Sequence, residues 1–408
     1  MSASPPAHRF HGPGAPAQGI AVPAISPAQS DYLDGLRGIA AQMVLLTHVL
    51  ALIIGDGKLT SALGSCAVAT FFLLSGFLVT YSALSKPPAS GYGLADFLSD
   101  RAFRIYAAYL PALVFVALAD ISLMHSPYYP KGAHGGAAQF FGNLAMLEDF
   151  PLFQMLRRAG LDASWFVTAY GSAGQFWTIS IEFWIYVAFG ISFYALRTGK
   201  PKLLGIAGLA LAFAAIEPLY HFAGGFGECL TMLWLAGCTG AFGLVYQGRV
   251  RALFRLRATS RPTMKKVWLG VAAVFLGFIA LRGLTSHLHW YDLQIGLYTG
   301  VVLFALFHVI GPAETFPLGR VWRAIAEYSY SLYLTHCTVL IAVATLAGGM
   351  LKGPLYIALL IAAPNLFAVA FWYLFERHYR GWSRAFRRWW HAGASIRPPA
   401  KSNAASPG

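Results

Sequence analysis

The chain has 408 residues, of which 57% are hydrophobic and only 11% are charged, and its mean hydropathy is +0.57. This composition is typical of a protein with many membrane-spanning segments and excludes an ordinary soluble domain. The net charge of +14 does not indicate nucleic-acid binding. The lysines and arginines fall in short clusters between apolar segments, where they act as topology signals.

Both ends of the chain are predicted to be tails. Residues 1–30 are rich in Pro, Ala and Gly and have no apolar core, so they are not a signal peptide and are expected to be a disordered cytoplasmic tail. Residues 381–408 are expected to form a basic cytoplasmic tail, disordered from about 393. The sequence between them, 31–380, is interpreted as one transmembrane domain.

Ten apolar segments between the tails are long enough to span a bilayer as helices. They are 35–56, 63–84, 102–124, 174–196, 203–222, 228–246, 266–284, 293–311, 324–346 and 355–376. The predicted fold class is therefore all-α, a polytopic membrane protein. The stretch from Gln139 to Phe150 is too short to span and is expected to be an interfacial or re-entrant helix.

The distribution of lysine and arginine predicts how these helices are oriented. With the N-terminus in the cytoplasm, 24 of the 30 basic residues fall on the cytoplasmic side and 6 fall outside or in outer halves. The positive-inside rule therefore places both termini in the cytoplasm of a multi-pass protein of the inner (plasma) membrane. The long excursion over 125–173 is then extracytoplasmic.

Arg37 and His48 lie on one face of the first apolar segment. Eleven residues separate them, which on an α-helix is three turns plus roughly 20° and about 16 Å along the axis. Arg37 would then lie at a headgroup surface and His48 near the middle of the hydrocarbon. Because ionisable side chains are costly in lipid, the pair indicates a polar passage through the protein. The alternative is an anchoring arginine and a histidine that packs between helices.

Glu182 and His336 are expected at the depth of His48. Counted from Gly174 as the outer end of its segment, Glu182 lies about 12 Å into the bilayer, and His336 reaches about the same level in the ninth segment. A histidine beside a carboxylate, shielded from water, is a suitable general base for a hydroxyl group. The alternative is that Glu182 and a histidine only bridge helices by hydrogen bonds.

Arginines gather at the predicted cytoplasmic end. Arg101 and Arg104 begin the third segment, three residues apart on one face, at the level of Arg37. Several guanidinium groups together suit bidentate bonds to a polyanion such as a nucleotide pyrophosphate. The alternative is anchoring to lipid phosphates, which is favoured for Arg320 and Arg323.

The cysteines and the second segment indicate packing. None of the four cysteines belongs to a CxxC pair and all lie in apolar segments, so the sequence predicts neither a metal site nor a disulfide framework. In the second segment, Ser75 and Gly76 interrupt a bulky apolar run. Close helix packing is the favoured interpretation there, over a place in the wall of the passage.

Five motifs in chain order resemble the acyltransferase 3 family of membrane O-acyltransferases. They are LDGLRG with Arg-x10-His (Arg37, His48), FFLLSGFL, RAFRIYAAYLP with its paired arginines, FWTISIEFWIY, and YSYSLYLTH. The resemblance covers about residues 31–380. One departure is that Glu376 is followed by Arg377 and His378, where many relatives have proline.

The resemblance implies transfer of an acyl group, most often acetyl, from cytoplasmic acyl-CoA to a hydroxyl of a sugar, polysaccharide or glycolipid. The catalytic residues it implies are His48, Glu182 and Arg37. The residues expected to bind the donor are Arg37, Arg101, Arg104 and Tyr106, and those expected to bind the acceptor are Trp177, Ser180, Tyr330 and His336. No permanently bound cofactor, metal or nucleic acid is expected. The form is the stand-alone one without an esterase-like domain, and an acyl-histidine intermediate and direct transfer both stay open.

Two alternatives come from other functional classes. A transporter or flippase would use His48, Glu182 and His336 as a proton relay, although the sequence has no inverted repeat and no pair of Gly/Pro-broken helices. A structural subunit of an envelope synthase would tolerate the loss of His48.

Overall fold

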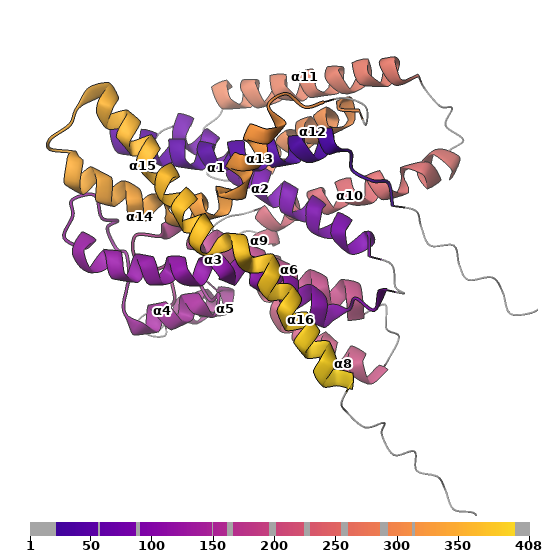
Figure 1. Ribbon diagram of the computed structural model, residues 1–408, viewed down its shortest axis with the longest axis horizontal. Coiled ribbons are helices and arrows are strands. Elements are labelled where there is room, and N and C mark those ends of the chain that lie inside the picture. Colours follow the sequence, from indigo (N-terminus) through magenta and orange to yellow (C-terminus); the bar gives the residue numbers. More distant parts are fainter. Residues whose placement is uncertain are drawn as a thin grey trace, which may run out of the picture.

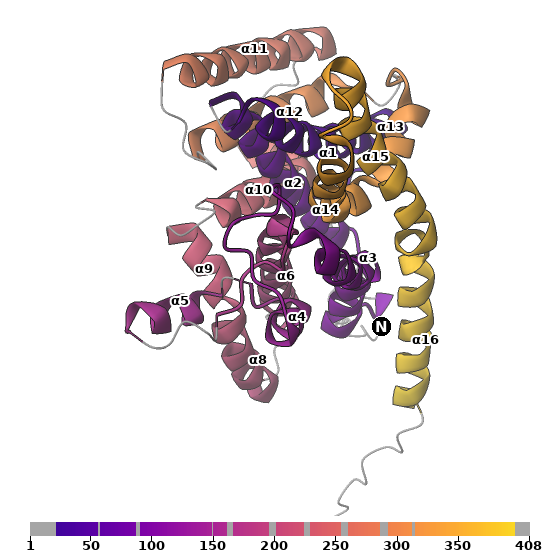
Figure 2. The ribbon, with the colours of Figure 1, turned by 90° about the vertical axis from the view of Figure 1, so that its left-hand side faces the viewer.

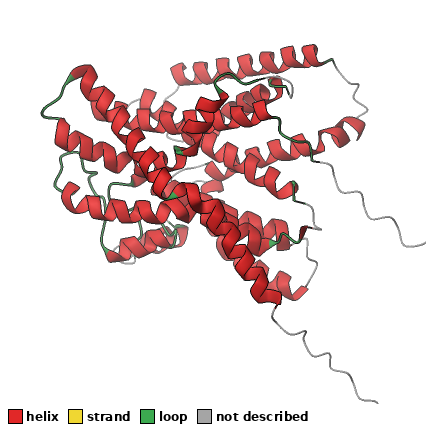
Figure 3. Cartoon of the chain, in the orientation of Figure 1, coloured by secondary structure: helices red, strands yellow, loops and turns green. Residues whose placement is uncertain are grey.

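The computed structural model describes residues 22–55, 58–86, 90–148, 150–160, 166–195, 201–223, 229–253, 260–285, 293–311 and 315–395. Within these ranges the chain is helical and contains no strand (Figures 1 and 3). A single isolated bridge joins His134 to Tyr170. The predicted all-α class is confirmed.

Eight helices in these ranges are long and apolar enough to cross a membrane. They are α1 (Pro27–Ile54), α2 (Lys58–Leu84), α3 (Leu94–Leu123), α6 (Trp177–Gly190), α10 (Leu230–Leu253), α11 (Arg261–Thr285), α14 (Ser329–Ala347) and α15 (Gly353–Leu374). The turns η3 (Gly174–Phe176) and η4 (Ile191–Ala195) extend α6 at its two ends. The prediction of a polytopic membrane protein is confirmed.

Two of the ten predicted spans differ from the structure. Segment 203–222 forms two short helices, α8 (Pro201–Ala214) and α9 (Ile216–Ala223), so one continuous span there was wrong. Pro218 explains the break, because it lacks the N–H that would bond to the carbonyl of Ala214 and its ring clashes with that group. Segment 293–311 forms α12 (Leu293–Val309), an apolar helix of 17 residues.

The two predicted tails contain helical residues at their inner boundaries. α1 already begins at Pro27, because the side chain of Ser26 accepts a hydrogen bond from the backbone N–H of Gln29 (3.2 Å) and the side-chain oxygen of Gln29 accepts one from the backbone N–H of Ser26 (3.0 Å). At the other end, α16 (Tyr379–Ser395) continues after the turn η5 (Glu376–His378). Residues 1–21 and 396–408 lie outside the described ranges.

α2 and α10 are in backbone contact. A Cβ atom added to Gly76 would lie 1.9 Å from the carbonyl oxygen of Trp234, and one on Gly237 would lie 2.1 Å from that of Leu73. The predicted packing role of Gly76 is therefore confirmed. α2 also packs against α1 and α12, and α3 packs against α6 and α14. These contacts place α1, α2, α3, α6 and α14 around a common interior.

The remaining helices lie around this interior. α11 runs along one edge of the molecule (Figures 1 and 2). Only 6% of its most apolar stretch is buried, as expected for a helix that faces lipid. The excursion after α3 contains α4 (Ala137–Leu144) and α5 (Pro151–Arg158). The stretch from Gln139 to Phe150, expected to be an interfacial or re-entrant helix, therefore forms the end of a short helix followed by a turn. α13 (Gly319–Glu327) packs against α1.

Candidate active site

Two cavities lie in the interior formed by α1, α2, α3, α6 and α14. The first, the His48 cavity, has a volume of about 360 Å³, and its wall includes His48, Ser172, Trp177, Thr178, Tyr333 and Cys337. The second, the arginine cavity, has a volume of about 160 Å³, and its wall includes Arg37, Arg101, Arg104, Glu182, Tyr186 and Tyr330. Val68, Thr178 and Tyr333 belong to both walls. The cavities are therefore adjacent and share part of one wall, on the line that a polar passage from the arginines to His48 would follow.

Two of the three arginines have carboxylate partners. Arg37 bonds to Asp34 at 2.8 Å, one turn earlier in α1. Arg104 forms an ion pair with Glu376, and its guanidinium group lies 4.9 Å from the ring centre of Tyr330. Glu376 is buried and also accepts hydrogen bonds from the backbone N–H (3.1 Å) and hydroxyl (2.7 Å) of Ser331. Glu376 thus fixes Arg104 on α3 against the start of α14.

Arg101 differs from its neighbours. It has no ion pair within the described part of the chain, and its Nε atom is buried without a hydrogen-bond partner there. Its guanidinium group lies 5.8 Å from the ring centres of both Phe97 and Tyr186. A cation that is partly buried without a carboxylate is costly unless an anion joins it. Arg101 is therefore the arginine with spare binding capacity for an anionic ligand.

His48 and His336 are neighbours, as the sequence predicts. Their ring centres are 5.1 Å apart and the ring planes meet at 47°. His48 is half-buried in the wall of its cavity, whereas His336 is fully buried beside it. The Nδ1 atom of His336 lies 3.0 Å from the carbonyl oxygen of Leu332 and 2.8 Å from that of Tyr333. A carbonyl only accepts, so Nδ1 carries the proton and Nε2 keeps a lone pair.

Glu182 lies in the arginine cavity, and it is absent from the wall of the His48 cavity. It accepts a hydrogen bond of 2.5 Å from the hydroxyl of Tyr186. The expected convergence of Glu182 with the histidines assumed that Gly174 marks the outer membrane surface. Gly174 instead lines the His48 cavity and Ala173 is fully buried, so α6 begins inside the protein and Glu182 lies deeper.

Two other residues expected at the site, Ser180 and Tyr106, bond to backbone carbonyls and lie outside both walls. The hydroxyl of Ser180 donates to the carbonyl of Met146 at 2.7 Å, as does Nε1 of Trp184. These bonds hold Met146 at a positive φ of 56°, which is unusual for a residue other than glycine. Tyr106 donates to the carbonyl of Leu144 at 2.8 Å. His336 is also outside both walls, but it contacts His48 and Cys337, which line the His48 cavity.

The comparisons with known proteins agree with this geometry. A family model described as "Acyltransferase domain" matches residues 30–378. The chain belongs to the acyltransferase 3 family. An O-acetyl transferase of Shigella phage Sf6 is 27% identical over 180 residues, which make up 42% of this chain and 48% of the phage protein. The match thus spans about half the length of that relative. No solved structure matches the chain.

Sequence reasoning about this acyltransferase 3 protein missed several residues of the site. Thr178 and Cys337 were not singled out, although both lie within one turn of residues that were. Ser75 was expected mainly to pack, yet it lines the arginine cavity and bonds to the hydroxyl of Tyr186 at 2.8 Å. Glu376 was noted only for the residues that follow it. Its charge in an apolar segment was the signal that could have revealed a partner for Arg104.

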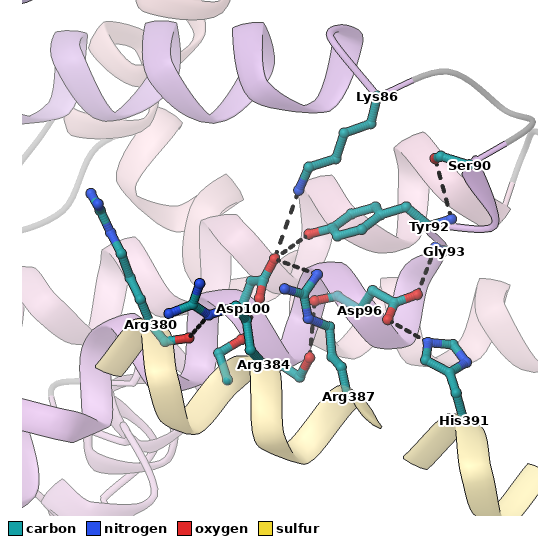
Figure 4. Close-up of polar contacts among 12 residues, drawn as sticks. Lys86, Ser90, Tyr92, Gly93, Asp96, Asp100, Arg380, Arg384, Arg387 and His391 are labelled. Carbon is teal, nitrogen blue, oxygen red and sulfur yellow. Dashed lines mark hydrogen bonds and ion pairs between the residues drawn. The ribbon is translucent and has the colours of Figure 1, made fainter. Parts of the chain in front are cut away.

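α16 fastens the arginine-bearing start of α3 in this family member. Asp100 accepts a hydrogen bond from the hydroxyl of Tyr92 (2.8 Å) and forms ion pairs with Lys86 (3.7 Å) and Arg387 (3.5 Å) (Figure 4). It also accepts a hydrogen bond from the hydroxyl of Ser383 on α16. One turn earlier in α3, Asp96 bonds to His391 of α16 at 2.8 Å. These contacts hold the helix turn just before Arg101, so the predicted tail contributes to positioning the arginine cavity.

Proposed function

We propose that this protein is a membrane O-acyltransferase that moves an acyl group, acetyl in the simplest case, from cytoplasmic acyl-CoA to a hydroxyl of a sugar, polysaccharide or glycolipid. The observation that carries the proposal is the junction of an arginine-lined cavity with a histidine-lined one inside a member of the acyltransferase 3 family. The phage relative is named an O-acetyl transferase, which supports acetyl as the acyl group that is transferred.

In this proposal the arginine cavity receives the donor. Arg101 binds a phosphate group of acyl-CoA with its uncompensated charge, and Arg37 and Arg104 add charge at the same level. Along α1 the distance from Arg37 to His48 is about 16 Å, a span that an extended pantetheine arm covers. The thioester then lies at the contact between the two cavities.

The His48 cavity receives the acceptor. The imidazole of His48 takes the proton of the acceptor hydroxyl as the oxygen attacks the acyl carbonyl carbon. The carbon–sulfur bond breaks, and the leaving thiolate takes a proton back from the imidazolium. Trp177 lines this cavity and supplies an apolar face for a sugar ring. Tyr330 lies at the donor end, against Arg104, so the acceptor role expected for it becomes a donor role.

Glu182 acts at the donor end in this proposal. Its carboxylate holds the hydroxyl of Tyr186, whose ring packs near Arg101. Glu182 therefore orients the side chains that line the donor cavity, and it does not orient the ring of His48 as the sequence suggested. The predicted orientation places the arginine cavity toward the cytoplasm and the His48 cavity toward the outer face of the inner membrane, where exported glycans are accessible.

The test is acyl transfer by the purified protein in lipid nanodiscs, with acetyl-CoA and a panel of glycan acceptors, followed by mass spectrometry. His48→Ala should abolish the acetylated product while the protein still inserts and purifies normally. Leu46→Ala, on the exposed side of the same helix, is the matched control and should keep the wild-type rate. Product formation by His48→Ala at the wild-type rate, or solute flux without release of CoA, would contradict the proposal.

A further inference from the structure

His48, His336 and Cys337 form a cluster of metal-binding side chains at the inner wall of the His48 cavity. One donor atom from each residue lies within 4.8 Å of the other two. Sγ of Cys337 lies 3.3 Å from Nε2 of His336. Two imidazoles and a thiol on two neighbouring helices are more than the transfer reaction needs, because the proposed mechanism uses only His48.

The ring of His336 is oriented as a metal ligand is. Its Nδ1 group donates to the carbonyls of Leu332 and Tyr333, so its Nε2 lone pair faces Cys337. Histidines that bind metals usually donate their other ring N–H to a carbonyl or carboxylate in this way, which fixes the tautomer and the ring direction. Burial of His336 among these partners makes the arrangement rigid.

The distances fit a tetrahedral ion after a small movement of one ligand. Bonds of about 2.0–2.1 Å to nitrogen and about 2.3 Å to sulfur place neighbouring ligand atoms of a tetrahedral zinc ion about 3.4–3.6 Å apart. The His336–Cys337 pair is already near that separation. Since the donor atoms all lie within 4.8 Å of one another, His48 needs to approach by at most about 1.3 Å, which rotation of a half-buried side chain beside a cavity allows.

The cavity supplies the fourth coordination position. His48 and Cys337 both line its wall, so an ion held between them faces open volume that a water molecule can enter. Three protein ligands with one open position form the arrangement of zinc sites whose fourth ligand is an exchangeable water, and a thiolate with two imidazoles favours zinc and its softer relatives over magnesium or calcium.

We propose that His48, His336 and Cys337 bind a zinc-class divalent cation, and that the bound ion blocks acyl transfer. On binding, the thiol of Cys337 loses its proton to solvent and the imidazoles donate their lone pairs to the ion. The lone pair of His48 is then no longer available to take the acceptor proton. The inhibitory part rests on the proposed function, whereas metal binding does not.

The direct test uses the metal alone. Cd²⁺ titrated into the purified full-length protein should produce the ultraviolet charge-transfer absorption of a cadmium–thiolate bond, with one ion per chain, and Zn²⁺ should compete it away. Cys337→Ala should abolish the band, and His336→Asn should weaken Cd²⁺ binding at least tenfold, since even loss of a supporting partner costs that much. Cys66→Ala, another half-buried cysteine, is the control and should keep the band.

The activity test separates the two proposals. Zn²⁺ should inhibit acetyl transfer by the wild type, and Cys337→Ala should need at least ten times more Zn²⁺ for half-inhibition, each compared with its own metal-free rate. Cys337→Ser, which is nearly isosteric, replaces the alanine variant if that variant does not fold. A Cys337-dependent Cd²⁺ band without any transferase activity would overturn the function and keep the site. Transferase activity without such a band, or a band that Cys66→Ala also removes, would overturn the site.

Discussion

The hydroxyl groups of Thr178 and Tyr333 lie 2.5 Å apart where the arginine cavity meets the His48 cavity. Both hydroxyls also point to the carbonyl of Gln175, Thr178 at 3.0 Å and Tyr333 at 3.5 Å. This contact joins α6 to α14. In the proposed mechanism, the thioester of a donor bound at the arginines passes beside this contact to meet an acceptor at His48.

Filling this contact should uncouple donor binding from transfer. We expect Thr178→Leu to lower the acetyl-transfer rate about a hundredfold with an unchanged Kd for acetyl-CoA, because misplacing the reacting groups by about 1 Å has that effect. Thr178→Val keeps the shape and removes only the hydroxyl, so it is the matched control and should lose much less. Equal rates for Thr178→Leu and the wild type would show that the substrates meet elsewhere.

Arg101 should determine donor affinity. Among the residues that the structure describes, Arg101 is the arginine of this cavity without an ion-pair partner, and replacing it by Gln removes a charge-assisted hydrogen bond worth about 1.5–3 kcal/mol. We therefore expect KM for acetyl-CoA to rise at least tenfold while kcat changes less. Arg323→Gln is the control, since Arg323 is 55% exposed and paired with Asp31. If both variants raise KM equally, the effect is general surface charge.

The Arg104–Glu376 pair should appear as a coupling in stability. Glu376→Gln leaves a partly buried guanidinium group without its carboxylate, and loss of one partner from such a pair costs about 3–5 kcal/mol when burial is complete. The thermal midpoint in detergent should fall markedly. Adding Arg104→Gln to Glu376→Gln should recover part of the loss. Strictly additive losses in this double-mutant cycle would mean that the pair contributes nothing specific.

Glu148 should make the stability of the protein depend on pH. It is fully buried beside Tyr109, and burial raises the pKa of its carboxyl group to about 8. Between the ordinary value near 4.5 and about 8, the folded protein holds a proton that the unfolded chain releases, so unfolding is favoured as the pH rises through this range. Thermal midpoints of the wild type should therefore fall from pH 5 to about pH 8, and those of Glu148→Gln should change less. Parallel profiles would contradict this assignment.

The close approach of α2 and α10 should make Gly76 intolerant of a side chain. A Cβ atom there would lie 1.9 Å from a backbone oxygen of α10, which cannot rotate away as a side chain does. Gly76→Ala should destabilise the protein by about 1–3 kcal/mol, the usual cost of overpacking. Gly270→Ala on α11, where no atom lies within 4 Å of the added Cβ, should not destabilise it. The two variants are compared by thermal unfolding in detergent.

Sequence periodicity located most spans because bilayer thickness fixes the length of an apolar helix. It misjudged 203–222, where one proline outweighs the apolar composition. The level of Glu182 was also misjudged, since counting 1.5 Å per residue gives depth only when the starting point is known. The burial of Ala173 and Gln175 on either side of Gly174, which removes that starting point, depends on how the 125–173 excursion packs.

By itself, the sequence determined that this is an all-α membrane protein of the acyltransferase 3 family, with Arg37 and His48 three helical turns apart on one face. Those features follow from local geometry and composition. Only the tertiary structure decided which arginine keeps an uncompensated charge, which cavity contains Glu182, and that Cys337 lies against His336 and near His48. Such relationships depend on side chains from separate helices, and no spacing along one helix specifies them.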